Sequence, residues 1–248
     1  MTNIKEKLSR NKAISIVGGH YSNSDLIDFM GQFGFDAFWV ECEHGPVTWE
    51  RIGDLSRACD LWNMACIVRV PSGEPSIITR TLDQGAQGII VPHVKSAAQA
   101  RRIAEAARFA PLGNRGVYSG CRRSYGVEDY FTRANEETLV SILIEDTEAL
   151  EDLDNILAVP NIDIFSVAPS DLAQSMGHLG NWKHPEVNSA IEETLRKIVA
   201  SGNTAGFIVN EDLDYYYDLG VRWFHVLWPN WLAQGARDFV GRVSALGK

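Results

Sequence analysis

The sequence predicts an α/β fold, a (β/α)8 (TIM) barrel formed by a single domain over residues 1–248. The chain has 248 residues, and one such barrel commonly takes about 200–250 residues. Eight short apolar runs alternate with longer segments of helical periodicity. Most runs are continuously apolar, as are strands buried on both faces of a parallel sheet. The predicted strands are 13–17, 36–41, 65–69, 88–92, 139–145, 163–167, 204–209 and 222–227.

The segments between these runs have the start and stop signals of helices. A capping residue or a proline precedes or opens five of them, near Ser24, Thr48, Ser76, Ser96 and Glu186. Glycines follow several helical segments before the next strand, at Gly34, Gly85, Gly202 and Gly220. Eight strand–helix units in a chain of this length indicate a closed barrel.

A doubly wound open sheet is the main alternative. Such a sheet usually has a glycine-rich phosphate-binding turn after its first strand. Here the first run is followed by Gly18-Gly19-His20-Tyr21, which is not GxGxxG, and no acidic ribose-binding residue follows at the usual distance. One long irregular segment, 110–126, follows the helix after the fourth strand. In a barrel we expect it at the catalytic face or at a subunit contact.

Charge and composition exclude several kinds of partner. The chain has 32 acidic and 23 basic residues and a net charge of −9, so we expect neither a nucleic-acid nor an anionic-membrane partner. The charged N-terminus does not resemble a signal peptide, and no apolar run approaches the roughly 20 residues that span a bilayer. The four cysteines have no CxxC or zinc-ribbon spacing, which predicts reduced thiols and a cytoplasmic location.

Polar residues follow the predicted strands where a barrel has its active site, at the carboxyl ends. These residues are Glu41, Glu43 and His44 after the second run, Arg69 after the third, Glu145 and Asp146 after the fifth, and Ala168-Pro169-Ser170-Asp171 after the sixth. Glu145 and Asp171 follow consecutive strands, and two carboxylates without a histidine or cysteine cluster suit Mg²⁺ or Mn²⁺. The alternative is that each carboxylate caps the helix that follows it.

The other strand-end residues predict a site for an anionic substrate. Arg69 can stabilise an oxyanion, and it can also form a salt bridge with Glu41 or Glu43; the two roles are compatible. His44 is the candidate general base, with Asp83 as the carboxylate that orients it. The alternatives are a structural histidine and a surface carboxylate at a helix end. Free amides at Ala168 and Ser170 can bind a carboxylate.

The positions of the lysines decide whether the chain can use Schiff-base chemistry. All seven lysines lie outside the predicted strands. A Schiff-base aldolase needs a lysine desolvated inside the barrel, so this mechanism is not expected.

Six motifs in order resemble the HpcH/HpaI family of metal-dependent pyruvate aldolases, over about residues 25–232. The motifs are Glu43-His44-Gly45-Pro46, Val68-Arg69-Val70-Pro71, the segments 82–92 and 110–116, Ile144-Glu145 and Ala168-Pro169-Ser170-Asp171-Leu172. The resemblance implies a (β/α)8 barrel in a homohexamer, a dimer of trimers that exchange the last helix. The C-terminal segment has an apolar stripe that suits this exchange, although a barrel could also bury it against itself.

The resemblance also implies roles for individual residues. Glu145 and Asp171 correspond to the ligands of a divalent cation, Mg²⁺, Mn²⁺ or Co²⁺. Arg69 corresponds to the arginine that binds the pyruvate keto oxygen, and His44 with Asp83 to the base dyad. The amides at Ala168 and Ser170 correspond to the carboxylate site.

The implied reaction is class II retro-aldol cleavage of a 4-hydroxy-2-oxo acid to pyruvate and an aldehyde through a metal-stabilised enolate. The alternatives are oxaloacetate decarboxylation or CoA-ester cleavage at the same site, and a non-catalytic barrel that binds metal and oxo acid. Three departures from the family pattern, at Glu41, Leu143 and Ala168, leave the chemistry plausible. Two others, at Gly18-Gly19 and at 228–231, change the pocket beyond pyruvate.

Aromatic and cationic residues are expected to line the acceptor part of the pocket, some of them contributed by a neighbouring subunit. They are His20, Tyr21, Tyr118, Arg122, Arg123, Tyr125, Trp228 and Trp231. Such a lining predicts tolerance of apolar or aromatic aldehydes, with an acidic semialdehyde as the physiological candidate. The alternative is that the tryptophans fill interface space.

Overall fold

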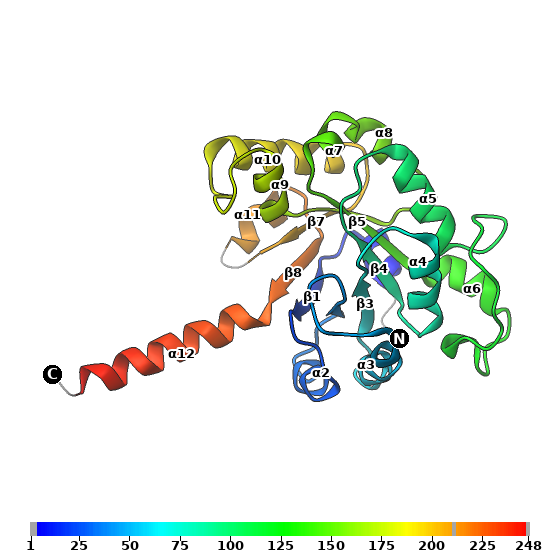
Figure 1. Cartoon of the computed structure of the whole chain (residues 1–248), viewed down its shortest axis with the longest axis horizontal. Helices are drawn as coiled ribbons and strands as arrows, with labels where there is room; N and C mark the ends of the chain where they lie inside the picture. Colours follow the sequence, from blue (N-terminus) through cyan, green and yellow to red (C-terminus); the bar gives the residue numbers. More distant parts are fainter. Residues whose placement is uncertain (1–3, 210–211, 247–248) are drawn as a thin grey trace.

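The computed structural model describes residues 4–209 and 212–246, and its centre is a closed barrel of eight parallel strands (Figure 1). Each strand pairs with its neighbours in sequence order, and β8 pairs with β1 to close the barrel. The strands are β1 (Ile14–Gly19), β2 (Ala37–Glu41), β3 (Ala65–Arg69), β4 (Gly88–Val91), β5 (Leu139–Ile144), β6 (Ile164–Val167), β7 (Ala205–Ile208) and β8 (Trp223–Leu227). All eight predicted strands are present, and the predicted barrel is confirmed.

Helices surround the barrel and connect its strands. They are α1 (Ile4–Ser9), α2 (Ser24–Gly31), α3 (Trp49–Leu61), α4 (Pro75–Asp83), α5 (Ala97–Ala107), α6 (Tyr130–Glu137), α7 (Thr147–Glu151), α8 (Leu153–Leu157), α9 (Pro169–Ser175), α10 (Pro185–Ala200), α11 (Leu213–Asp218) and α12 (Trp228–Ala245), with a 3₁₀ turn, η1 (Arg122–Ser124). Helix α10 shows the expected packing pattern, because it buries Val187, Ile191, Leu195 and Ile198 at spacings of three and four residues. In α2 and α5 the side chains of Asn23 and Ser96 cap the first turn.

Two apolar layers form the core. The larger one lies between the strands and the helices and includes Phe38 and Val40 of β2. The smaller one fills the barrel and includes Ala37 and Trp39 of the same strand. Successive side chains of a strand point to opposite faces, so every second residue enters the barrel. This alternation decides which strand-end residues reach the active site.

Helix α12 does not pack along the barrel. Figure 1 shows it projecting away from the other helices, and none of its described residues is buried. Several of its apolar residues are more than half exposed, among them Leu232 at 66% and Phe239 at 67%. The alternative that the barrel buries the apolar stripe of the C-terminal segment against its own surface is therefore wrong for the described chain. In the described residues, no helix has both the length and the apolar character needed to cross a membrane.

The irregular segment 110–126 lies at the end of the barrel where the strands begin. Arg122 and Arg123 both pair with Asp60 near the end of α3, and Arg123 also donates to the carbonyl oxygen of Gly85, just before β4. Within one chain the segment is therefore far from the carboxyl ends of the strands, and the expectation of a place at the catalytic face is wrong. A helix brings the chain back to the amino ends before each strand, and this segment follows such a helix.

Candidate active site

Three strand-end side chains enter the barrel because of the two-residue alternation. The interior layer contains Trp39, Ile67 and Leu143. Each lies two positions before a polar residue, and these polar residues are Glu41, Arg69 and Glu145. The sequence therefore aims two carboxylates and a guanidinium into the mouth of the barrel at its carboxyl end.

Glu145 is the most deeply buried carboxylate of this set, with 1% of its surface exposed. Its Oε1 accepts a hydrogen bond of 2.7 Å from the backbone N–H of His93, and its buried Oε2 has no partner among the described residues. Burial raises the pKa of Glu145 to about 7, the nearby charges of Asp171 and Glu43 add to the rise, and His93 opposes it. An unpartnered buried carboxylate oxygen is costly unless a cation or a proton occupies it.

The surroundings of Glu145 fit a divalent cation. Asp171 lies in the first turn of α9, and no side chain caps this helix, so the idea that Asp171 caps it is wrong. Its charge acts on Glu145, as does that of Glu43. Carboxylate oxygens suit a hard ion such as Mg²⁺ or Mn²⁺. Glu145 and Asp171 would hold this ion, and the unpartnered Oε2 is the observation that supports the fit.

Arg69 is held in one orientation at the mouth of the barrel. Its Nε donates to Oε2 of Glu41 at 2.7 Å, and its Nη1 lies 3.1 Å from Oε2 of Glu43. The guanidinium also lies over the ring of Trp39, 5.0 Å from the ring centre. Oε1 of Glu41 accepts from the backbone N–H groups of Glu43 and His44. The predicted ion pairs of Arg69 therefore exist, and they orient its donors.

His93 belongs to this site, although it is not among the residues predicted from the sequence. It follows β4 in the left-handed conformation, with φ at 54°. Its Nδ1 lies 3.2 Å from Oδ2 of Asp146, and its Nε2 lies 3.7 Å from Oε1 of Glu43. Burial lowers the pKa of His93, but the charges of Glu145, Asp146 and Glu43 outweigh this and raise it overall. The signal that could have found it is its position directly after the fourth apolar run.

His44 and Asp83 do not meet within one chain. The imidazole of His44 is exposed over 64% of its surface, and its Nε2 lies 3.6 Å from Oε2 of Glu43. Asp83 ends α4 at the opposite end of the barrel, where it accepts a 2.7 Å hydrogen bond from Arg115. Within the described chain, the carboxylate beside His44 is that of Glu43.

The turn before α9 has fewer free amides than expected. The N–H of Ala168 already donates to the carbonyl oxygen of Ile144, at 3.3 Å. Pro169 has no N–H. The expectation of a free amide at Ala168 is therefore wrong in this structure, whereas Ser170 lies in the first turn of α9, where amides lack partners within the helix.

The eight predicted acceptor residues fall into separate groups. His20 and Tyr21 follow β1, and Trp228 begins α12 directly after β8, so these three lie near the catalytic end. Trp231 stacks on Phe35 with ring centres 6.2 Å apart. Tyr118, Arg122, Arg123 and Tyr125 lie in the segment 110–126 at the opposite end. One chain therefore does not assemble the whole predicted pocket.

Gly19 and Trp228 fit each other at the point where the barrel closes. A Cβ on Gly19 would lie 2.6 Å from Nε1 of Trp228 and 2.9 Å from Cδ of Pro229. Only glycine allows the indole to lie this close to β1. Nε1 of Trp228 is buried and has no partner among the described residues. The two segments expected to change the pocket, Gly18-Gly19 and 228–231, therefore meet in the structure.

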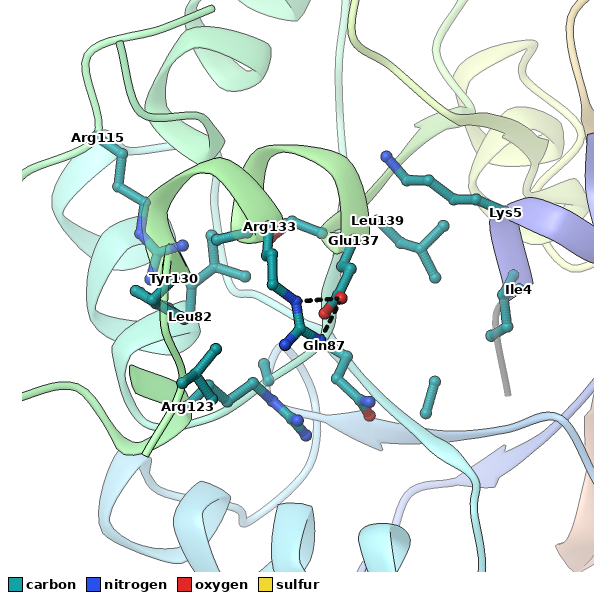
Figure 2. Close-up of a pocket in the computed structure, with 15 residues that line it drawn as sticks. Ile4, Lys5, Leu82, Gln87, Arg115, Arg123, Tyr130, Arg133, Glu137 and Leu139 are labelled. Carbon is teal, nitrogen blue, oxygen red and sulfur yellow. Dashed lines mark hydrogen bonds and ion pairs between the residues drawn. The ribbon is translucent and has the colours of Figure 1, made fainter. Parts of the chain in front are cut away.

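A separate cavity of about 320 Å³ lies at the amino end of the barrel, away from these residues. Figure 2 shows Arg115, Arg123 and Arg133 around it, with Arg133 paired to Glu137. Its wall includes residues at the start of strands, such as Leu139. In (β/α)8 barrels this end serves stability, and the chemistry takes place at the other end.

A family model and several known proteins match most of this chain. The family model described as HpcH/HpaI aldolase/citrate lyase matches residues 20–216. The chain belongs to this family. The family resemblance predicted from the sequence is confirmed, and the protein is a carbon–carbon lyase of the aldolase type.

Relatives in the HpcH/HpaI family cover most of the chain. A hydroxypyruvate/pyruvate aldolase of Roseobacter denitrificans is 33% identical over 231 residues, which are 91% of this chain and 90% of the relative. A 2-keto-3-deoxy-L-rhamnonate aldolase of Klebsiella pneumoniae is 36% identical over 190 residues, which are 75% and 71% of the two chains. The crystal structure of an HpcH/HpaI aldolase from Desulfitobacterium hafniense has a TM-score of 0.89 at 28% identity, and the match covers 97% of this chain and 96% of that one.

Proposed function

We propose that this HpcH/HpaI aldolase cleaves a 4-hydroxy-2-oxo acid to pyruvate and an aldehyde, and that it requires Mg²⁺, Mn²⁺ or Co²⁺. The observation that carries the proposal is the buried Glu145 carboxylate with its unpartnered Oε2, near the charge of Asp171 and at the same end of the barrel as an oriented Arg69. The relatives named as hydroxypyruvate/pyruvate aldolases support the same reaction class.

The side chains of the site divide the work of the reaction. A divalent cation between Glu145 and Asp171 would supply Lewis-acid polarisation of the 2-oxo acid. Arg69 directs N–H donors toward the negative charge that develops on the keto oxygen. His44, beside Glu43, takes the proton of the C4 hydroxyl. Asp83 can orient His44 only from a neighbouring subunit, because within one chain it lies at the opposite end of the barrel.

The test of this function uses purified full-length protein and a panel of 4-hydroxy-2-oxo acids, with pyruvate measured by a coupled dehydrogenase. We expect pyruvate release that a chelator abolishes and that added Mg²⁺ or Mn²⁺ restores. Activity that resists the chelator, or borohydride trapping of a substrate adduct on lysine, would contradict the proposal. Oxaloacetate in the same panel tests whether decarboxylation is the main activity.

The acceptor side is proposed to be partly aromatic. Tyr21 and Trp228 lie at the catalytic end, which supports tolerance of apolar or aromatic aldehydes. Arg122 and Arg123 can pair with an acidic semialdehyde only from a neighbouring subunit, because within one chain they bind Asp60. An aldehyde panel with pyruvate and Mn²⁺ compares wild type with Trp228→Ala. An unchanged acceptor profile would contradict the role of the indole.

We further propose a closed homo-oligomer, with a hexamer expected from the family, in which α12 packs on a neighbouring subunit. The exposed apolar residues of α12 support this, since a soluble chain rarely leaves such a stripe uncovered. Light scattering at micromolar concentration tests it, and a monomeric mass would contradict it. The four free cysteines support a cytoplasmic location.

A further inference from the structure

The loop between α9 and α10 gathers three metal-ligating side chains outside the active site. His178 lies in this loop, His184 caps α10, and Glu186 lies in the first turn of α10. One ligand atom from each of the three residues lies within 4.8 Å of the others. None of them belongs to the set of Glu145 and Asp171. They form a separate cluster of two imidazoles and one carboxylate.

One distance between ligand atoms in the cluster is close to that of a coordination shell. Nε2 of His178 lies 3.0 Å from Oε2 of Glu186, and the two imidazole rings stack with centres 3.7 Å apart and planes 15° apart. In a tetrahedral zinc site with bonds of about 2.0–2.1 Å, neighbouring ligand atoms are about 3.3 Å apart. The three ligand atoms lie within 4.8 Å of one another. Because the lone pair of an imidazole nitrogen lies in the plane of its ring, the two stacked rings must rotate away from their parallel arrangement for both nitrogens to face one ion.

The backbone of the loop is held by a series of short hydrogen bonds. The N–H of His178 donates to the carbonyl oxygen of Ala173 at 2.7 Å, and that of Asn181 donates to His178 at 2.9 Å. The N–H of His184 donates to Asn181 at 3.0 Å. These turns fix the two histidines relative to each other before any ion binds. Such preorganisation favours binding because little conformational entropy is lost.

The ligand set selects a different ion from the one proposed for the active site. Imidazole nitrogens suit Zn²⁺ and other first-row transition ions, whereas sites made only of oxygens suit Mg²⁺ and Mn²⁺. The nearest lysine in the loop, Lys183, does not compete for the position, because its Nζ lies over the ring of Trp182. Glu186 is 71% exposed at its side chain, so water or another ligand can complete the shell.

We propose that His178, His184 and Glu186 form a second cation site that binds Zn²⁺ or a similar transition ion with an open fourth position. The site lies at the catalytic end of the barrel, because α9 follows β6 and α10 runs back to the start of β7. A bound ion would tie the loop to the first turn of α10. It would thereby stabilise the segment that follows the Asp171 helix, by linkage of binding to folding.

The experiment measures Zn²⁺ binding to full-length, chelator-treated protein by equilibrium dialysis in excess Mg²⁺, which occupies the oxygen site. The test variant is His178→Asn/His184→Asn, because asparagine at 184 preserves a good N-cap for α10. We expect the variant to bind one Zn²⁺ fewer per chain than wild type and to lose the rise in melting temperature that Zn²⁺ gives wild type. Glu186→Gln alone is expected to weaken binding by about tenfold or more.

Two control variants distinguish this site from the active-site cation and from nonspecific binding to surface carboxylates. Glu193→Gln, at an exposed glutamate of the same helix that pairs with Lys197, should leave Zn²⁺ binding unchanged. Glu145→Gln should keep the Zn²⁺ of the second site even where it abolishes aldolase activity. Equal Zn²⁺ stoichiometry and affinity in wild type and in the folded double variant would overturn the proposal. Loss of this Zn²⁺ in Glu145→Gln would also overturn it, because the ion would then belong to the active site.

Discussion

Replacing Glu145 by glutamine should stabilise the metal-free protein at alkaline pH. Burial raises the pKa of Glu145 to about 7 in the folded chain, from 4.5 in a solvated chain. Each pKa unit corresponds to about 1.4 kcal/mol, so at pH 8 the ionised carboxylate destabilises the folded state by about 3 kcal/mol. A glutamine has no charge to bury, and its Oε1 can still accept from the N–H of His93.

The pH dependence of this stabilisation follows from the raised pKa of Glu145 in the folded chain. Between pH 4.5 and 7 the folded state keeps a proton on Glu145 that the unfolded state has lost, so the wild-type free energy of unfolding falls as pH rises. Below pH 4.5 both states are protonated and the penalty is absent. Between about pH 5 and pH 8, the stability difference between Glu145→Gln and wild type should therefore change by about 2–3 kcal/mol in favour of the variant. Any change in packing energy caused by the glutamine amide is the same at both pH values. It therefore cancels when the stability differences at the two pH values are compared.

Urea unfolding followed by tryptophan fluorescence, with chelator and at a fixed protein concentration, measures this difference. Glu151→Gln is the matched control, because the residue is exposed at the end of α7, and it should change stability by less than about 0.5 kcal/mol at either pH. In parallel, calorimetry should show that Glu145→Gln has lost most of its affinity for Mg²⁺ or Mn²⁺. A stability difference that does not change between the two pH values, or normal metal affinity, would refute the reasoning.

Three further substitutions test other parts of the structure. Arg69→Lys should lower kcat/KM for retro-aldol cleavage by about 10²–10³-fold, because lysine cannot bind Glu41 and the substrate with an oriented fork; a loss below about tenfold in steady-state assays would contradict this. Burial and the charge of Arg69 lower the pKa of His225 to about 3, so wild-type stability should fall as pH drops below about 6.5. His225→Gln should lessen that fall by about 2 kcal/mol between about pH 7 and pH 5 in urea unfolding, and parallel curves would argue against it. Gly19→Ala should destabilise the fold by about 1–3 kcal/mol, because its Cβ would meet the indole of Trp228. It should also change the aldehyde profile, and an unaltered melting temperature together with an unaltered profile would count against the close fit.

The barrel was predictable because its strands are buried on both faces. A run such as Ile142–Ile144 needs no tertiary information to be recognised as a central parallel strand. The alternation of side chains then aims Glu41, Arg69 and Glu145 into the barrel, and this step also follows from the sequence. His93 was missed for a different reason. Its position directly after the fourth apolar run marks it as a strand-end residue, but its backbone N–H donates to Glu145 from a left-handed conformation, and a pattern of side chains does not predict this hydrogen bond.

The positions of Asp83 and of segment 110–126 show where reasoning from motifs conflicts with topology. Asp83 ends a helix and segment 110–126 follows one, and in a (β/α)8 barrel these helices end at the amino ends of the strands. Asp83 accordingly binds Arg115, and Arg123 binds Asp60. Topology alone therefore places these residues away from His44 within one chain. Their proposed contribution to the site requires a second subunit whose amino-end face meets the catalytic end of the first.

The coupling of Gly19 to Trp228 could not be read from the sequence, because the two residues lie near opposite ends of the chain. They become neighbours when β8 pairs with β1, in a register that places Gly18 opposite Leu227. The next residue along the chain is then Gly19, the last of β1, on one side and Trp228, the first of α12, on the other. A bulky residue can follow β8 only if a small one ends β1, so the two departures from the family pattern depend on each other. The acceptor role that we propose for Trp228 therefore depends on the place where the barrel closes, and we expect exchange of either residue alone to disturb packing as well as recognition.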